Sequence, residues 1–106
     1  MKLPLEGIRI LDPSQVWAGP TCTKILGDLG ADIIKVESAR RMDIARGDAH
    51  NPQIDQGMYL DNEPTDKPWD RTGRYLDRNR SKRNICLDLT HERGVDAFKR
   101  LAMNSD

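Results

Sequence analysis

Residues 10–26, ILDPSQVWAGPTCTKIL, place a short apolar run directly before a turn and the start of a helix. The first N–H groups of a helix have no partner within it, so such a start commonly holds an anion. A dinucleotide site would need the loop G-x-G-x-x-G here, with an acid such as Glu37 after the next strand. This turn has only Gly19, and Pro20 has no N–H to offer a diphosphate. The pattern therefore predicts an anionic ligand but does not favour NAD or FAD.

A second candidate anion site is the basic run at residues 71–83, RTGRYLDRNRSKR, which holds six cations and one acid. Two interpretations are open: the run is a solvated loop, or its cations pair with phosphates just before the next strand. Tyr75 is its only aromatic residue, which is too few for a platform that stacks the bases of a nucleic acid. We expect no nucleic-acid partner.

The other reactive side chains are too scattered for metal binding or nucleophilic catalysis. His50 and His91 are far apart, and neither is near a cysteine at the spacing of a metal site. Ser14 and Cys22 have no histidine nearby that could act as a base. Cys22 and Cys86 are expected to be reduced thiols that pack as small buried hydrophobic residues.

The composition is typical of one small soluble domain. Among 106 residues, 17 Lys plus Arg balance 17 Asp plus Glu, so the zero net charge gives no global attraction to nucleic acid or membrane. No apolar run approaches the roughly 20 residues that span a bilayer. The amino terminus lacks the apolar stretch of a secretory signal. We expect a cytoplasmic protein without a membrane partner.

Hydrophobic periodicity predicts an α/β protein that begins with a parallel β-α-β unit. Residues 8–11 and 31–36 are the expected strands. Between them, a helix from Pro20 to its carboxyl-terminal glycine, Gly30, carries a predicted apolar face. The residues of that face are Cys22, Ile25, Leu26 and Leu29.

The periodicity then lapses over residues 38–83, which we expect to be a long loop. Residues 84–89 are the third predicted strand, and Thr90 is expected to cap a last helix. The inner side of that helix is expected to carry Val95, Phe98, Leu101 and Ala102. Three strands and two helices cannot cover both faces of a parallel sheet, so we infer an incomplete domain.

Four stretches, in combination, resemble the family III CoA-transferases, which include formyl-CoA, carnitine and benzylsuccinate CoA-transferases and α-methylacyl-CoA racemase. They are PLEGIRILD at 4–12, V-x-A-G-P at 16–20, LGDLGADIIKVE at 26–37 and NRSKRNICLDL at 79–89. Residues 41–74 match least. The resemblance implies that residues 1–106 form the N-terminal portion of the large CoA-binding domain, with a Rossmann-like fold.

The resemblance also implies that CoA lies over the first strand–helix turn and extends along the segment after the third strand. Carried over residue by residue, the CoA-binding positions are Val16, Trp17, Ala18, Leu87, Asp88, Leu89 and Thr90, and Arg40 and Arg83 are added as cations for the phosphates of CoA. Arg41 and Lys82 are further candidates for the phosphates, which require cations. The family's pattern has an arginine at the position of Ser38, for which Arg40 and Arg41 are close enough to substitute. It has a lysine at the position of Thr90, so one possible phosphate contact is absent.

The implied activity of the full-length parent is transfer of CoA between carboxylic acids, without a metal or prosthetic group. An aspartate takes the acyl group as a mixed anhydride and passes it on through an enzyme–CoA thioester. That aspartate matches no residue here, so no catalytic residue is assigned and the chain alone is expected to be inactive. The parent is expected to bind acyl-CoA and carboxylic acids and to form an interlocked homodimer. Two alternatives stay open: a 2-methylacyl-CoA racemase, and a non-catalytic remnant that binds CoA or another nucleotide.

Overall fold

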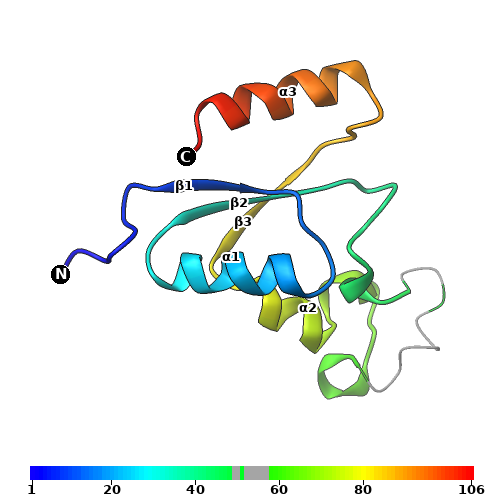
Figure 1. Ribbon diagram of the computed structural model, residues 1–106. Coiled ribbons are helices and arrows are strands. Elements are labelled where there is room, and N and C mark those ends of the chain that lie inside the picture. Colours follow the sequence, from blue (N-terminus) through cyan, green and yellow to red (C-terminus); the bar gives the residue numbers. More distant parts are fainter. Residues whose placement is uncertain (49–50, 52–57) are drawn as a thin grey trace.

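The computed structural model describes residues 1–48, 51 and 58–106, which form a sheet with helices on both sides (Figure 1). The strands are β1 (Arg9–Asp12), β2 (Asp32–Glu37) and β3 (Lys82–Cys86). The α-helices are α1 (Ala18–Asp28), α2 (Gly73–Arg78) and α3 (Glu92–Met103). Between β2 and α2 lie the 3₁₀ turns η1 (Ile44–Arg46), η3 (Leu60–Asn62) and η4 (Pro68–Asp70).

The sheet has the order β1-β2-β3 with both pairs parallel, which confirms the predicted α/β class and β-α-β unit. β1 and β2 are shifted by one residue from the predicted ranges. The predicted third strand, 84–89, has the wrong bounds, because β3 begins at Lys82 and ends at Cys86. Lys82 and Arg83 enter the sheet because Asp12 and Asp32 neutralise their charges at 3.0 Å and 2.6 Å.

The carboxyl end of α1 is the one that the sequence predicts. Gly30 follows the helix with a φ of +104°, a conformation that glycine adopts without a steric penalty. Its N–H donates to the Gly27 carbonyl at 2.9 Å, and the N–H of Ala31 donates to the Leu26 carbonyl at 3.1 Å. These two bonds form a Schellman motif, which turns the chain from the helix into β2.

The side of α1 that faces the sheet is more polar than the sequence predicts. Cys22, Ile25 and Leu29 are exposed, so the predicted apolar face is wrong for these residues. Thr23 instead donates its hydroxyl to the buried carboxylate of Asp12 at 2.6 Å. The sheet presents charged side chains to α1, and a polar helix face satisfies them. Cys86 is also exposed, so the expected burial of both cysteines is wrong.

The segment expected to be a long loop contains regular structure in its described part. It contains α2, and the fully buried Thr72 before this helix donates its hydroxyl to the Ala45 carbonyl at 2.6 Å. Thr72 also forms an antiparallel bridge with Tyr59. The prediction of a plain loop over 38–83 is wrong because polar contacts, which leave no hydrophobic periodicity in the sequence, hold this segment together.

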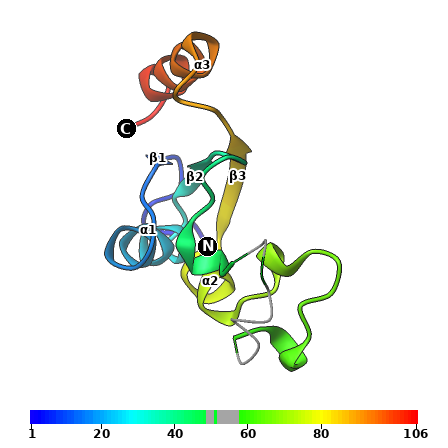
Figure 2. The ribbon, with the colours of Figure 1, turned by 90° about the vertical axis from the view of Figure 1, so that its right-hand side faces the viewer.

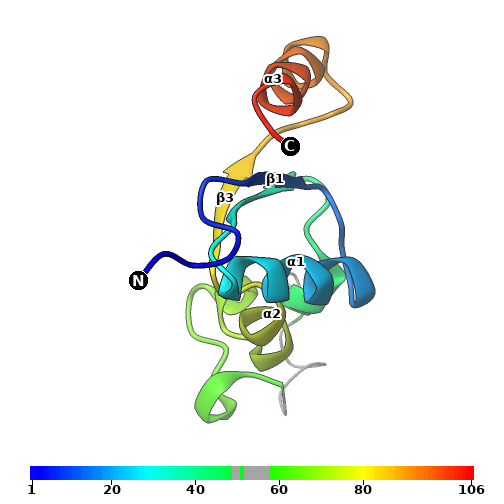
Figure 3. The ribbon, with the colours of Figure 1, turned by 60° about the vertical axis from the view of Figure 1, so that its left-hand side comes forward.

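Helix α3 lies across the sheet from α1 and α2 (Figures 1, 2 and 3). Of its expected inner residues, Val95, Phe98 and Leu101 are only half-buried and Ala102 is exposed, so the prediction is wrong for Ala102. None of the twelve residues of this helix is fully buried. Beyond the helix, the Asp106 N–H donates to the Arg9 carbonyl at 2.8 Å, at the outer edge of β1. No helix within the described residues is both long and apolar enough to cross a bilayer.

The start of α3 corrects the predicted cap. His91, not Thr90, is the N-cap residue, because its Nδ1 accepts a hydrogen bond from the Arg93 N–H at 3.2 Å. Thr90 belongs to the preceding turn, where its N–H and hydroxyl both donate to Asp88.

Candidate functional site

A pocket of about 320 Å³ opens where the three parallel strands end. Each strand contributes the residues at or just after its carboxyl end. In open parallel sheets this edge is the usual place for a ligand, because the connections that leave the strands surround it. The lining residues are Pro13, Gln15, Val36, Glu37, Ser38, Arg40, Arg41, Leu87, Asp88, Leu89 and Thr90.

The structure brings most of the expected CoA-binding residues to this edge. The residues that line the pocket are Arg40, Leu87, Asp88, Leu89 and Thr90. The turn after β1 sends Gln15 into the same pocket and then presents three exposed residues, Val16, Trp17 and Ala18. The assignment of CoA contacts to these nine positions, Arg83 included, stays a prediction.

Arg83 is the expected residue that the structure places elsewhere. Its guanidinium bonds both carboxylate oxygens of Asp32 at 2.6 Å, and Arg9 bonds the same carboxylate at 2.8 Å. Asp32 opens β2, so this cluster lies toward the amino end of the strands, away from the pocket. Hydrogen bonds from Arg83 and then Arg9 lower the pKa of Asp32, so the cluster keeps its charges near neutral pH.

The basic run is held by contacts within this chain and is not a solvated loop. Its cations bond to this chain: Arg71 to the Glu63 carbonyl at 2.8 Å, Arg80 to Asp28 at 2.8 Å, and Lys82 to Asp12 at 3.0 Å. Arg74 and Arg78 likewise donate to backbone carbonyls of Ala45 and Val16. The interpretation as a solvated loop is therefore wrong, and the pairing of these cations with phosphates stays a prediction.

Arg40 and Asp88 face each other across the pocket. The Arg40 side chain is 84% exposed, and its Nε lies 3.6 Å from the Asp88 carboxylate. Hydrogen bonds from the Thr90 hydroxyl, then from its backbone N–H, and the charge of Arg40 lower the pKa of Asp88. Because the ion pair is long and Arg40 is solvated, this cation is available to a phosphate at little cost.

Glu37 lines the pocket and belongs to a buried polar network. Its carboxylate accepts hydrogen bonds from Arg46 at 2.9 Å and 3.0 Å and from the Tyr75 hydroxyl at 2.6 Å. Asn84 donates to both Glu37 and Tyr75. The guanidinium of Arg46 also lies over the Tyr75 ring, 3.6 Å from its centroid.

The protonation states in this network are fixed. Burial alone would raise the pKa of Glu37, but the hydrogen bonds from Arg46 and Tyr75 outweigh it and lower the pKa to about 2. Burial, together with the bond to Glu37, raises the pKa of Tyr75 well above its ordinary value. Glu37 thus stays a carboxylate and Tyr75 a phenol, so neither is suited to proton transfer near neutral pH. Their role is to support the floor of the pocket.

The described residues provide no cluster of three His, Cys, Asp or Glu side chains that could hold a metal ion. The Ser14 hydroxyl is bonded to Asp12, and His91 caps α3. His50 lies outside the described residues. The cationic, polar and apolar side chains of the site can recognise a ligand.

Sequence reasoning missed the buried side chains that support the site. Lys35, Asp43 and Arg46 are buried and charged, and they lie on or just after β2. A signal was present: Lys35 interrupts the apolar run of Ile33, Ile34 and Val36, and a charge within a buried strand requires a partner. The identity of the partner, Asp43, is set by the fold and leaves no mark in the spacing.

The fold and the pocket together define a parallel α/β domain with a pocket at the carboxyl edge of its sheet. Comparison with protein families matches residues 5–106 to CoA-transferase family III. The chain belongs to CoA-transferase family III, and the resemblance found in the sequence is confirmed.

Individual relatives agree with this membership. The chain is 36% identical over 104 residues to the succinyl-CoA–L-malate CoA-transferase beta subunit of Chloroflexus aurantiacus, covering 98% of this chain and 22% of that protein. It is 39% identical over 103 residues to the succinyl-CoA:glutarate CoA-transferase of Mus musculus, covering 97% of this chain and 20% of that protein. The chain thus spans about one fifth of the length of these curated relatives.

Solved structures show the same fold. A CaiB/BaiF family protein from Brucella suis superposes with a TM-score of 0.73 at 30% identity, over 100% of this chain and 25% of that one. A hypothetical protein from Mycobacterium tuberculosis superposes with a TM-score of 0.72 at 35% identity, over 98% of this chain and 24% of that one.

Proposed function

We propose that this chain supplies part of the CoA site of an enzyme that transfers CoA between carboxylic acids. The observation that carries the proposal is the pocket at the carboxyl edge of the sheet, where residues from all three strand ends converge. Family membership supports the reaction class, and the relatives described above are named as CoA-transferases, which favours transfer over racemisation.

The chemistry of the pocket suits the nucleotide half of CoA. Val36, Leu87 and Leu89 give it apolar walls for the adenine, and Arg40 and Arg41 on its rim give cations for the phosphates. From there the pantetheine arm would run over the exposed turn at Val16, Trp17 and Ala18. These residues bind and orient CoA and do not touch the acyl carbon.

The reaction itself requires a nucleophile from outside residues 1–106. In the proposed route an aspartate carboxylate attacks the acyl-CoA carbonyl, forms a mixed anhydride and expels CoA as the thiolate. The thiolate then attacks the aspartyl carbonyl to give an enzyme–CoA thioester and releases the first carboxylic acid. The second carboxylate attacks this thioester, expels the CoA thiolate and forms a new mixed anhydride. The thiolate then attacks the second acyl carbonyl of that anhydride, which gives the new acyl-CoA and regenerates the aspartate carboxylate. Through these steps the pocket would hold the nucleotide end of CoA in place.

Calorimetric titration of CoA into the 106-residue chain tests the proposal. We expect saturable binding of CoA, and weaker binding of adenosine, which lacks the phosphates. Arg40→Gln should lower the affinity for CoA roughly fivefold, which corresponds to the loss of about 1 kcal/mol from an exposed charge pair. Arg80→Gln is the matched control, because Arg80 is exposed and bonds to Asp28 and Asp77 instead. A folded chain that binds no CoA would contradict the proposal.

A further inference from the structure

The turn after β1 is held in a strained conformation. Val16 has a φ of +75°, which a β-branched residue rarely adopts because its side chain crowds the backbone. Its side chain is exposed, so core packing does not account for the strain. Such strain persists only where the surrounding structure holds it, and it concentrates at ligand sites.

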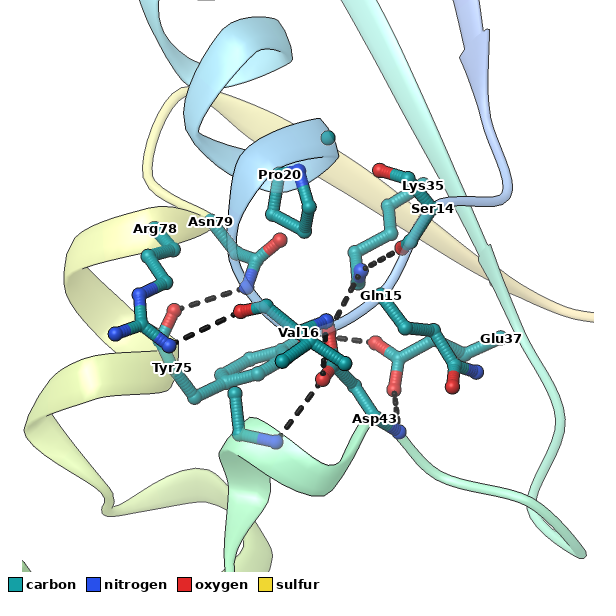
Figure 4. A network of polar contacts seen from close by, with 12 residues as sticks. Ser14, Gln15, Val16, Pro20, Lys35, Glu37, Asp43, Tyr75, Arg78 and Asn79 are labelled. Atoms are coloured by element: carbon teal, nitrogen blue, oxygen red, sulfur yellow. Dashed lines mark hydrogen bonds and ion pairs between the residues drawn. The ribbon is translucent and has the colours of Figure 1, made fainter.

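Three charged side chains from distant parts of the sequence hold this turn (Figure 4). The Val16 N–H donates to Asp43 Oδ1 at 3.0 Å, and the Val16 carbonyl accepts from Arg78 Nη1 at 3.0 Å. Lys35 also supports the turn, because its Nζ donates to the Ser14 carbonyl at 2.8 Å. Both polar groups of the Val16 backbone are thus bonded to side chains from outside the turn.

Burial makes this arrangement costly. The side chains of Lys35 and Asp43 have no exposed surface, and their ion pair is 3.1 Å long. Removing two charges from water costs several kcal/mol per ion before their attraction is counted. Asp43 is itself oriented, because its N–H donates to Glu37 at 3.2 Å, which links the turn to the network under the pocket.

The strained turn separates two neighbouring side chains. Gln15, before Val16, lines the pocket. Trp17, after it, stacks on Arg78, whose guanidinium carbon lies 3.6 Å from the ring centroid. A relaxed, extended Val16 would redirect the chain between Gln15 and Trp17.

We propose that Lys35, Asp43 and Arg78 are positioning residues that keep the turn at residues 14–17 in the conformation that receives CoA. The inference rests on the proposed function, since it names the groups that organise the same site. These three residues act through the backbone of the turn and do not touch the ligand.

A double-mutant cycle between Asp43→Ala and Val16→Gly tests the inference. Glycine adopts positive φ without a steric penalty, so the turn should depend less on Asp43 when residue 16 has no side chain. In the chain that keeps Val16, we expect Asp43→Ala to lower the affinity for CoA at least about tenfold, the loss typical of a hydrogen bond to a charged group. In the Val16→Gly chain, the same substitution should lower the affinity for CoA less than about threefold.

A second readout does not depend on CoA. In a Trp69→Phe background, Trp17 is the only tryptophan, and its emission reports the stacking on Arg78. Asp43→Ala should change this emission in the Val16 chain and change it less in the Val16→Gly chain. Circular dichroism identifies variants that do not fold, and if Asp43→Ala is one of them, Arg78→Met replaces it in the CoA-binding arm of the cycle only, because loss of Arg78 changes the Trp17 emission directly.

A matched control separates positioning from general loss of stability. Thr72→Val removes a buried hydrogen bond from the same segment, but Thr72 anchors Ala45 and not the turn. It should lower stability without coupling to Val16→Gly in either readout.

The outcomes separate the two proposals. Equal losses in both backgrounds, for CoA and for Trp17 emission, would overturn the positioning role while the CoA site stands. If the two substitutions are coupled in the Trp17 emission but no folded chain binds CoA, these residues hold the turn, and its link to CoA is overturned together with the proposed function.

Discussion

Replacing Lys35 with methionine should destabilise the chain by an amount that its two contacts set. Lys35 Nζ bonds Asp43 at 3.1 Å and the Ser14 carbonyl at 2.8 Å, and its side chain has no exposed surface. Methionine fills much of the same space, so the main effect is a buried carboxylate without its counter-ion. Removing one partner of a buried pair typically costs about 3–5 kcal/mol. Small domains have only about 5–15 kcal/mol of folding free energy, so the loss would be severe.

Urea denaturation, followed by circular dichroism, measures this free energy of unfolding. Lys24→Met is the matched control, because the 3.4 Å pair of Lys24 with Asp77 leaves the Asp77 side chain 61% exposed, and the expected loss is below about 1 kcal/mol. The double variant Lys35→Met, Asp43→Asn should recover part of the loss, since it removes both charges while the amide oxygen can still accept from the Val16 and Ala45 N–H groups. A loss below about 1 kcal/mol for Lys35→Met alone would refute the reasoning that this pair is buried and essential.

Three further results are expected. Ala18→Leu should weaken CoA binding without lowering the melting temperature, because Ala18 is exposed and a larger side chain there obstructs the pantetheine arm. A lower melting temperature with unchanged affinity for CoA would oppose this. The free energy of unfolding should fall as the pH drops from about 4.5 to about 2, since the fold lowers the pKa of Glu37 across that range and favours its carboxylate. Acid denaturation monitored by circular dichroism should show a smaller pH dependence of stability in Glu37→Gln, and an unchanged pH dependence would count against this. Incubated with acyl-CoA donors and carboxylate acceptors, the chain alone should show no CoA exchange above background by chromatography, and turnover that copurifies with it would oppose the proposed route.

Local sequence signals predicted the β-α-β unit well because its determinants are local. Gly30 marks the end of α1, since few other residues tolerate its positive φ. The apolar run after Gly30 predicts β2, and the parallel pairing follows from a helix between two strands. Each of these inferences needs only neighbours in the sequence.

Long-range charge pairing accounts for most of what could not be predicted. Lys82 and Arg83 are typical of a loop until Asp12 and Asp32, more than 50 residues earlier, are known to lie beside them. The support of the pocket has the same origin. Glu37 lies where a dinucleotide site would need an acid, yet it bonds Arg46, within a segment that has no hydrophobic periodicity.

The candidate site divides in the same way. The residues that follow the strand ends, such as Arg40 and Asp88, could be placed at one edge because parallel strands end together. Arg83 precedes the end of its strand by three residues, and its pairing with Asp32 keeps it away from that edge.

An NMR titration of the isotopically labelled chain with CoA tests the central claim most directly. We predict saturable shifts in the amide signals of the turn and the pocket, namely Val16, Trp17, Ala18, Arg40, Arg41, Leu87, Asp88, Leu89 and Thr90. The signals of Arg9, Asp32 and Arg83, which form the ion cluster toward the amino end of the strands, should not move. Shifts confined to that cluster, or no shifts at saturating CoA in the folded chain, would contradict the proposed site.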